Sequence, residues 1–357
     1  MVSALDHSAN IHLKEVKKQL SDKVELTGIF DRSLGNPYVD ISSLAVMGFT
    51  DVINKLPFFL KLSRKMVELA ADADKVMLID SSGFNLPLAK KIRKQHPDKT
   101  MIYYILPQAW AWKKNRIAVL ERTIDSLASI LPFEPDCYPQ SAPIEYVGHP
   151  LLDEIPEFKQ GLGNTGKIAF MPGSRTGEIN RLMPVFKKLR QKIDSEAYLV
   201  VPGNFDNEMM QKNYGDLSGF TPVHNAHEAL IECDFAFICS GTATLEAALI
   251  GIPFVLCYIA KPLDYMIAEK IIQLEYVGLA NIIFDRLNGE AMHPELIQKN
   301  VTLENLLHEF STMDRETFFD KSCNLRDYLK HGSAAPVARI IENGAAESVY
   351  KNRVCTS

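Results

Sequence analysis

The sequence contains no Cys-x-x-Cys pair and no apolar run that approaches the roughly 20 residues needed to cross a bilayer. Its six cysteines also lack a zinc-like spacing with histidine, which argues against a metal site and predicts reduced thiols in a cytoplasmic protein. The amino terminus has no charged start followed by an apolar core and a cleavage site, so no secretory signal is predicted. Any contact with a membrane is therefore expected to be peripheral.

A strong charge of one sign is also missing. The formal net charge of −5 excludes a general attraction to nucleic acid or to anionic membranes, and it leaves only local basic patches. Hydrophobic residues make up 46% and charged residues 23% of the chain, as in folded globular proteins. Because 357 residues exceed what one hydrophobic core usually serves, we expect two domains.

Short apolar runs alternate with amphipathic stretches through the first 150 residues, a pattern typical of βαβ units around a parallel sheet. After a short first strand within residues 1–4, this half is predicted to form a Rossmann-like domain. The predicted strands are 24–30, 75–80, 101–106 and 127–131, and the predicted helices include 86–96 and 115–125.

A polar, glycine-rich stretch at residues 158–166 precedes a second series of the same kind. The predicted domains are therefore 1–160 and 161–302, and helices in 303–357 are expected to return to the first domain or to pack on a partner chain. The predicted strands of the second half are 167–171, 197–201, 235–239 and 253–257, with helices that include 177–193 and 242–250.

Three apparent motifs have the wrong structural context. Residues 161–166 spell G-x-G-x-x-G, but they precede a predicted strand and so present no helix amino terminus to a pyrophosphate. Read as a P-loop, the same stretch has Ile168 where Ser or Thr is required. Asp72 and Asp74 spell D-x-D, but they also precede a strand, and we interpret them as a solvated helix end.

Two strand-to-helix turns in the second half are suited to bind an anion. In the first, Gly173, Ser174 and Arg175 lead into a helix whose free N–H groups carry partial positive charge. Arg175 adds a planar guanidinium that suits phosphate. A turn capped by Ser174, with Arg175 in solvent, fits these residues equally well.

The second turn contains Ser240, Gly241 and Thr242, which would offer backbone and hydroxyl donors at the next helix start. Glu246 lies one turn further and is suited to accept from ribose hydroxyls, although it also fits a helix-surface carboxylate. Two such turns in one half can converge on a single diphosphate.

In the first half, Asp80 ends the predicted strand 75–80. Ligands of open α/β sheets bind at the carboxyl edge of the strands, where Asp80 is placed to act as a general base for a sugar hydroxyl. A helix-capping role is the alternative. The loop 5–10 lies at the equivalent edge of the first strand and is expected to bring Asp6, Ser8 and Asn10 toward Asp80.

Both tryptophans of the chain, Trp110 and Trp112, lie beside Lys113, Lys114 and Arg116. Aromatic side chains next to cations suit a lipid or a phosphate-bearing acceptor, although a packed helix start with a basic outer face fits the same residues.

Residues 56–66 combine consecutive apolar residues with basic ones, which favours either an interfacial membrane contact or a core helix. The candidate membrane-contact residues are Phe58, Phe59, Leu60, Arg64 and Lys65.

An ordered series of short segments resembles the lipid-A-disaccharide synthase family, from the amino terminus to about residue 298. The segments are Leu44-Ala-Val-Met-Gly48, Ile79-Asp80 with Phe84-Asn85, Gln108-Ala-Trp-Ala-Trp112, Leu131-Pro-Phe-Glu134, Val147-Gly-His-Pro150, Pro172-Gly-Ser-Arg175, Ser240-Gly-Thr-Ala-Thr-Leu-Glu246, Lys261-Pro262, and Tyr276-Val277 with Asn281. Each is weak alone, but together and in this order they are highly specific.

The resemblance implies the GT-B fold, an α/β architecture of two Rossmann-like domains with parallel sheets facing across a cleft. It also implies inverting sugar transfer without a metal or other cofactor, at the cytoplasmic face of the inner membrane. UDP-2,3-diacylglucosamine would be the donor and 2,3-diacylglucosamine 1-phosphate the acceptor, giving a β-1,6-linked disaccharide and UDP. The chain is expected to act as a monomer or a homodimer.

The resemblance aligns Asp80 with the family's essential aspartate and Arg175 with its essential arginine. It assigns Ser240, Thr242, Glu246 and Asn281 to the UDP side and Asn85 to the acceptor side.

The loop 5–10 departs from the family's G-E-A-S-G-D, with Asp6 in place of the glutamate and Asn10 in place of the aspartate. Two other kinds of function remain alternatives. One is another GT-B enzyme that uses UDP-GlcNAc, either an epimerase or the undecaprenyl-linked transferase of peptidoglycan synthesis. The other is a non-catalytic protein that binds a UDP-sugar or a lipid.

Overall fold

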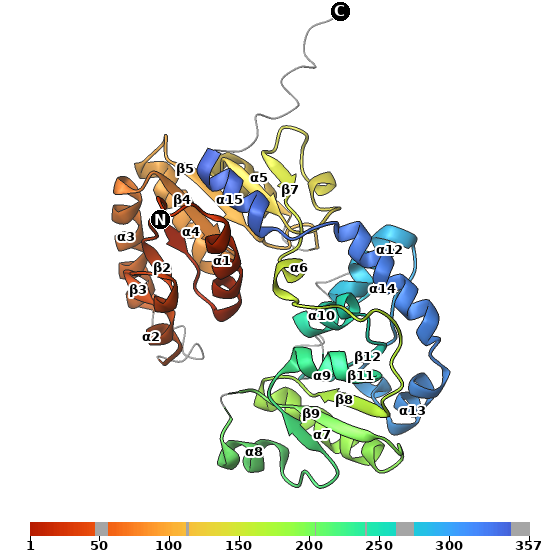
Figure 1. The fold of residues 1–357 in the computed structure, drawn as a ribbon. Coiled ribbons are helices and arrows are strands. Elements are labelled where there is room, and N and C mark those ends of the chain that lie inside the picture. Colours follow the sequence, from red (N-terminus) through yellow and green to blue (C-terminus); the bar gives the residue numbers. More distant parts are fainter. Residues whose placement is uncertain (47–55, 112–113, 204, 240, 262–274, 344–357) are drawn as a thin grey trace, which may run out of the picture. The chain divides into compact units, whose positions relative to one another are not determined.

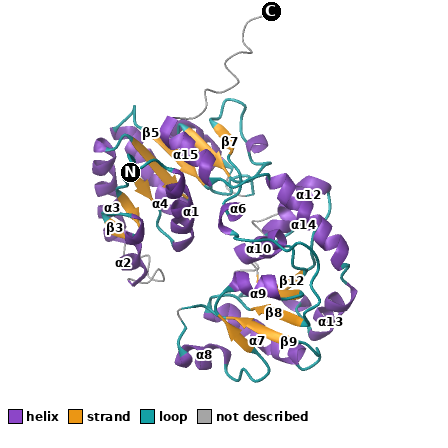
Figure 2. Ribbon diagram, in the orientation of Figure 1, coloured by secondary structure: helices purple, strands orange, loops and turns teal. Residues whose placement is uncertain are grey.

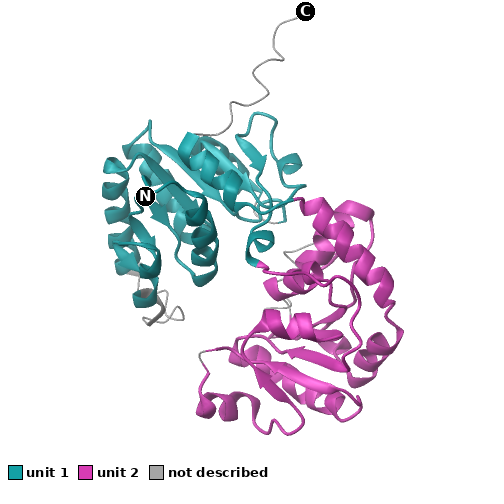
Figure 3. Cartoon of the chain, in the orientation of Figure 1, with its two compact units in different colours: residues 1–154, 331–357 teal, residues 155–330 magenta. Residues whose placement is uncertain are grey.

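The computed structural model describes residues 1–46, 56–111, 114–203, 205–239, 241–261 and 275–343 (Figure 1). The chain divides into two compact units (Figure 3). Unit 1 contains residues 1–154 and 331–357, and unit 2 contains residues 155–330. Each unit is a parallel β-sheet with helices packed on it, as the alternating sequence pattern predicts (Figure 2).

The sheet of unit 1 has the strand order β3-β2-β1-β4-β5-β6-β7, and every pair in it is parallel. Its strands are β1 (Val2–Ser3), β2 (Gly28–Phe30), β3 (Val39–Asp40), β4 (Lys75–Ile79), β5 (Thr100–Tyr104), β6 (Ser126–Ser129) and β7 (Ile144–Tyr146). Its helices are α1 (His7–Gln19), η1 (Arg32–Leu34), α2 (Ile41–Val46), α3 (Leu56–Asp72), α4 (Ser82–Gln95), α5 (Asn115–Thr123), η3 (Pro135–Cys137), α6 (Leu151–Glu154) and α15 (Ala334–Asn343).

Alternation along β4 explains how this sheet is covered on both faces. Val76 and Leu78 are fully buried in a core cluster with side chains of α3, α4 and α5. The intervening Met77 and Ile79 belong to a second cluster, with side chains of α1 and α15. Successive side chains of a strand point to opposite faces, so one apolar run serves both clusters.

The sheet of unit 2 has the order β10-β9-β8-β11-β12-β13, again with parallel pairs. Its strands are β8 (Lys167–Met171), β9 (Glu196–Val200), β10 (Thr221–Val223), β11 (Phe235–Cys239), β12 (Phe254–Tyr258) and β13 (Glu295–Ile297). Its helices are α7 (Thr176–Arg190), α8 (Asn207–Tyr214), α9 (Ala226–Glu232), α10 (Thr242–Ile250), α12 (Leu279–Asn288), η4 (Gln298–Asn300), α13 (Leu303–Thr312) and α14 (Arg315–Leu329).

The boundary between the units differs from the expected division at residues 160 and 161. Unit 2 already begins at Ile155, because the segment after it is tied to unit 2: the Lys159 N–H donates to the carbonyl of Ile250 at 2.9 Å, and the Arg326 guanidinium lies 5.1 Å from the ring centre of Phe158. The carboxyl-terminal helices are also divided between the two units. Helices α13 and α14 belong to unit 2, and α15 packs on α1 in unit 1.

Most of the strands predicted from the sequence lie within one or two residues of their expected bounds. The exception is β2, which starts later than the expected residue 24. It begins at Gly28, which pairs with Val2 of β1. A side chain at Gly28 would meet the carbonyl oxygen of Val2 at 2.2 Å, and its φ of +122° also favours glycine. The first two strands therefore approach each other closely only from this glycine onward.

The strand orders also locate the edges where ligands are expected. In each sheet, successive strands are first added toward one edge and then toward the other. This change of direction lies between β1 and β4 in unit 1 and between β8 and β11 in unit 2. Open α/β sheets bind ligands beyond the carboxyl ends of the strands at such a switch point. The loops that follow these four strands contain Asp6, Asp80, the turn of Gly173, Ser174 and Arg175, and Gly241, all predicted from the sequence.

Candidate active site

The turn after β4 holds Asp80 in an unusual backbone conformation. Asp80 and Ser81 have φ angles of +45° and +39°, a region that non-glycine residues rarely occupy and that costs on the order of 1 kcal/mol or more each. Three hydrogen bonds hold the Asp80 backbone there, from its N–H to the Tyr104 carbonyl at 3.0 Å, and to its carbonyl from the Tyr103 hydroxyl at 2.6 Å and the Asn85 amide at 2.9 Å. The turn leaves the Asp80 side chain exposed at the edge of the sheet.

Asp6 joins the loop after β1 to this turn. One of its carboxylate oxygens accepts from the Ala9 N–H at 2.7 Å and caps α1, and the other accepts from the Ser81 hydroxyl at 2.7 Å. Of the three residues expected from this loop, Asp6 thus contacts the turn that contains Asp80. The pKa of Asp80 is raised above its ordinary value, first by partial desolvation and then by the negative charge of Asp6. Both effects move the pKa of this carboxyl toward the range that suits a general base.

Asn10 and Asn85 lie beneath this edge rather than on it. Asn85 is fully buried; its amide oxygen accepts from the Ser3 hydroxyl at 2.7 Å, and its amide NH₂ donates to the carbonyl oxygens of Ile79 and Asp80. Asn10 is also buried and donates to the carbonyls of Ala4 and Asp6. Their amides hold the two loops in place, so an acceptor contact expected for either side chain is not supported by its burial.

The other acceptor-side residues are distributed unevenly. Arg116 donates to the Ser82 hydroxyl at 3.2 Å, which brings its guanidinium to the start of α4. Ser8 is exposed, and its hydroxyl lies 3.1 Å from His12 Nε2. Trp110 is buried and packs edge-on against Phe133, so it belongs to the core. Trp112 and Lys113 lie outside the described residues.

Two polar pairs in unit 1 were not predicted from the sequence. His12 Nδ1 is paired with the carboxylate of Glu154, across 142 residues. Glu134 is buried after β6 and accepts from the Ser129 hydroxyl at 2.6 Å. Burial raises the pKa of Glu134 to about 7, although the Ser129 hydrogen bond opposes the shift. No local sequence pattern links Glu154 to His12, which lies 142 residues earlier. None indicates that Glu134 is buried beside Ser129 either.

In unit 2, the turn after β8 leaves no room for a side chain at Gly173. A Cβ there would come within 2.5 Å of Glu178 Oε2, and the φ of +95° also favours glycine. Ser174 and Arg175 follow and are exposed at the start of α7. The Arg175 guanidinium donates to Glu178 Oε1 at 3.0 Å, and the Glu178 carboxylate is nearly buried. Glu178 thus holds Arg175 over the amino terminus of α7.

The turn after β11 leads directly into α10. Gly241, with φ of +142°, is the residue before the helix, and Thr242 is exposed at its first position. The buried Thr244 donates from its hydroxyl to the Gly241 carbonyl at 2.8 Å, which fixes the entry of the chain into the helix. Glu246 is half-buried one turn further along. Ser240 lies outside the described residues.

Asn281 is fully buried in α12, away from any exposed surface. Its amide oxygen accepts from the N–H groups of Met292 and His293, and its amide NH₂ donates to the His293 carbonyl and to Glu295 Oε1. The same Glu295 carboxylate accepts from the N–H groups of Val277 and Gly278 at the start of α12. Glu295, which the sequence did not single out, therefore occupies this helix amino terminus, and Asn281 acts within the fold.

Helix α3 is only partly a surface helix. Phe58 and Phe59 are half-buried against the core cluster of α3, α4 and α5, and Phe59 packs edge-on against Phe84. Leu60 is 47% exposed and Arg64 is exposed, while Lys65 pairs with Glu68 at 2.9 Å. The expected membrane-contact residues thus divide into a packed aromatic pair and an exposed apolar and basic face.

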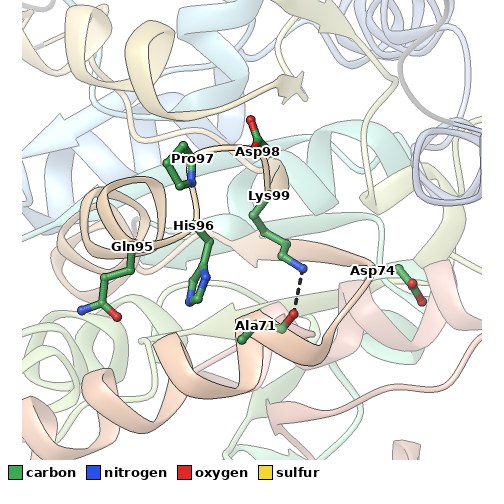
Figure 4. A pocket seen from close by; sticks show the side chains of 7 residues that line it. All are labelled: Ala71, Asp74, Gln95, His96, Pro97, Asp98 and Lys99. Atoms are coloured by element: carbon green, nitrogen blue, oxygen red, sulfur yellow. Dashed lines mark hydrogen bonds between the residues drawn. The ribbon is translucent and has the colours of Figure 1, made fainter.

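A shallow pocket lies at the opposite, amino-terminal edge of the first sheet (Figure 4). Its lining comes from the segments just before β4 and β5, and Lys99 donates across it to the Ala71 carbonyl at 3.2 Å. Asp74, the second aspartate of the D-x-D triplet, is also part of the lining. Because Asp80 lies at the carboxyl end of β4, this pocket is separate from the candidate active site.

Comparison with known proteins shows which family this sequence matches. The sequence profile of the family described as lipid-A-disaccharide synthetase matches residues 1–329. The lipid-A-disaccharide synthase of Helicobacter pylori (strain G27) is 48% identical over 352 residues, covering 95% of this chain and 96% of the relative. That of Campylobacter jejuni (strain RM1221) is 44% identical over 365 residues, covering 96% and 98%.

Solved structures are similar at much lower identity. MurG of Acinetobacter baumannii has a TM-score of 0.59 at 15% identity, covering 96% of this chain and 97% of its own. The UDP-GlcNAc 2-epimerase of Neisseria meningitidis has a TM-score of 0.60 at 10% identity, covering 94% and 96%. The calicheamicin glycosyltransferase CalG4 has a TM-score of 0.59 at 13% identity, covering 98% and 97%. These likenesses establish the GT-B fold, and they do not distinguish substrates.

Proposed function

Because this chain belongs to the lipid-A-disaccharide synthase family, we propose that it transfers the sugar of UDP-2,3-diacylglucosamine to 2,3-diacylglucosamine 1-phosphate. The products are the β-1,6-linked disaccharide 1-phosphate and UDP. The observation that carries the proposal is 48% identity to a lipid-A-disaccharide synthase over 95% of the chain. The likenesses to an epimerase and to MurG, at 10% and 15% identity, concern the fold alone and favour neither alternative.

Asp80 is the proposed general base. The 6-hydroxyl of the acceptor attacks the anomeric carbon of the donor, its proton passes to the Asp80 carboxylate, and the bond between that carbon and the UDP oxygen breaks with inversion. The exposed side chain and the raised pKa of Asp80 support this role, because a base needs access to the hydroxyl and affinity for its proton.

The turn after β8 is the proposed diphosphate site. Negative charge develops on UDP as the bond breaks, and a guanidinium together with helix N–H groups stabilises such charge. The exposed Arg175 and Ser174 and the helix start of α7 support this role, as do Gly241 and Thr242 at the start of α10. Glu246 is the proposed acceptor of hydrogen bonds from the ribose.

Incubation of the purified protein with both acylated substrates, in the presence of a chelator, tests the proposal. Mass spectrometry should detect the tetra-acylated disaccharide 1-phosphate together with an equal amount of UDP. Binding of UDP without product would point to a non-catalytic protein. Conversion of UDP-GlcNAc to its epimer, or transfer of GlcNAc to an undecaprenyl-linked acceptor, would point to the other enzymes.

We further propose that the exposed face of α3 contacts an anionic membrane surface, because the substrates carry acyl chains. None of the described helices has the length and apolar character that a bilayer crossing requires. The exposed Leu60 offers an apolar group, and the exposed Lys61 and Arg64 offer charges that anionic lipids attract.

Sedimentation with vesicles that contain anionic phospholipid tests this contact. The double substitution Lys61→Glu with Arg64→Glu should reduce the bound fraction at least several-fold. The matched control is Lys90→Glu with Lys94→Glu on α4, where both lysines are also exposed and the charge change is equal. Equal losses in the two variants would indicate a general charge effect and would contradict a contact through α3.

A further inference from the structure

A second arginine of α7, Arg181, has its end group at the same turn as Arg175. Arg181 is half-buried, and its Nε donates to the carbonyl of Ile259, in the loop that follows β12, at 2.5 Å. This bond restrains the guanidinium at its Nε atom. The side chain therefore joins α7 to the loop after β12 at the carboxyl edge of the second sheet.

The position of Gly177 shows where the other two nitrogens of Arg181 lie. A Cβ at Gly177 would be 3.2 Å from Arg181 Nη1 and 3.6 Å from Nη2. Gly177 is the second residue of α7, so the guanidinium lies against the first turn of that helix. A larger residue at this position would press on the guanidinium.

The charges around this group differ from those around Arg175. Arg175 is compensated by Glu178, whose carboxylate lies 3.0 Å away. Within the part of the chain that the structure describes, Arg181 forms no ion pair, and its hydrogen bond to Ile259 uses only Nε. Burial is the largest influence on the pKa of the neighbouring Tyr258 and raises it, while the positive charges of Arg181 and Arg175 oppose that shift. Both guanidinium groups therefore lie close enough to the end of β12 to influence the pKa of Tyr258.

We propose that Arg181 is a second cationic ligand of the donor's diphosphate, with Nη1 and Nη2 directed to one phosphate group while Nε remains on Ile259. A guanidinium offers its N–H groups as a planar fork that matches two phosphate oxygens, and a fork already held on one side loses little freedom on binding. This inference rests on the proposed function, because it concerns the same UDP-sugar. It adds a residue whose positive charge has no ion-pair partner among the described residues.

A purely structural role is the competing explanation, and Arg190 provides a matched control for it. Arg190 lies on the same helix and likewise joins it to neighbouring loops, with Nε donating to the Gly219 carbonyl at 2.6 Å and Nη1 to the Ile193 carbonyl at 2.9 Å. It lies at the far end of α7, away from the turn after β8.

Calorimetric titration of uridine, UMP and UDP into the full chain distinguishes the two roles. Arg181→Gln should raise the Kd for UDP about tenfold or more and leave the Kd for uridine unchanged, because only the phosphates meet the lost cation. Arg190→Gln should leave all three constants unchanged. Arg181→Lys, which keeps the charge but loses the fork and the bond to Ile259, should weaken UDP binding to a smaller extent; it serves as the test variant if Arg181→Gln does not fold.

Two results would overturn the inference while leaving the proposed function intact. One is wild-type affinity for UDP in the Arg181 variants, and the other is an equal loss for uridine and UDP. A wild-type chain that bound no UDP would instead contradict the proposed function, and the role of Arg181 with it.

Discussion

The carboxylate of Asp153 accepts hydrogen bonds from the backbone N–H groups of Ser333 and Ala334, at 2.7 and 2.9 Å. Asp153 is in α6, near the end of the first segment of unit 1, and Ser333 lies just after the chain returns to that unit. The two N–H groups belong to the start of α15, so a residue 180 positions earlier satisfies this helix terminus. Gly332 fits against Asp153 only because it has no side chain.

Replacement of Asp153 by Ala should destabilise unit 1 by about 1–2 kcal/mol, because it leaves two N–H groups of α15 without an acceptor. Urea denaturation measures the change. Asp314→Ala is the control, since Asp314 caps α14 from the adjacent position in an exposed setting and should matter less. Equal stability of the wild type and the Asp153 variant would show that water replaces this cap.

Glu134 should make stability depend on pH. Its pKa of about 7 in the folded protein lies above the ordinary glutamate value, so its contribution is present below about pH 4.5 and is lost as the pH rises through 7. Over that range the loss should be on the order of 3 kcal/mol. Glu134→Gln should flatten this part of the pH profile of the unfolding free energy. A profile unchanged by the substitution would mean that the buried carboxyl does not titrate in this range.

Replacement of Asp80 by Asn should lower kcat at least a hundredfold, because the acceptor hydroxyl loses its base, while the Kd for UDP stays close to that of the wild type. Asp98→Asn is the control, as that residue lies at the amino-terminal edge of the sheet. Single-turnover kinetics and calorimetry separate the two quantities. An Asp80 variant with wild-type turnover would remove this residue from the reaction.

Asp6 should influence the pKa of the general base, Asp80, without accepting the proton itself. Its negative charge contributes to the raised pKa of Asp80, after desolvation, and Asp80 works in its ionised form. Activity should therefore fall as the pH drops through that pKa, and Asp6→Asn should move this acid limb to lower pH. The amide oxygen of Asn can still accept from the Ala9 N–H, and its NH₂ group can donate to the Ser81 hydroxyl oxygen, so the turn is retained. An acid limb that does not move would show that the Asp6 charge is screened.

Asn281 should matter more for stability than for UDP binding. Asn281→Ala would leave the N–H groups of Met292 and His293 without acceptors, and we expect a loss of at least about 2 kcal/mol in urea denaturation. Asn305→Ala, which removes one exposed hydrogen bond to the Asn300 carbonyl, is the control. A stable Asn281 variant with weakened UDP binding would instead support the direct contact that the family resemblance implies.

Local pattern was enough to predict most of the strands. The strands β8 and β11 and the helix α10 have the bounds expected from the sequence, because burial of both sheet faces produces continuous apolar runs of strand length. The strand-turn-helix order also indicated Asp80 and the turns around Gly173 and Gly241, since a residue that follows a parallel strand must lie at the carboxyl edge.

The amide side chains could not be interpreted in the same way. Asn10, Asn85 and Asn281 look like polar residues near a site, but each is buried and bonded to backbone groups from other segments. The sequence contains no signal of burial for an isolated asparagine, because its partners are carbonyl and N–H groups that every residue has. Burial of these amides is decided by which loops pack over them.

The sequence by itself determined the two α/β units, the parallel sheets and the edge at which Asp80 and the turns around Gly173 and Gly241 lie, because periodicity and turn residues act over a few positions. Tertiary structure alone decided which loops meet. β1 pairs with β2 and β4, and only this strand order brings Asp6 to Ser81. Likewise, Arg181 reaches Ile259 only because α7 crosses toward the end of β12. Such contacts depend on crossover connections between distant segments, and no local pattern encodes them.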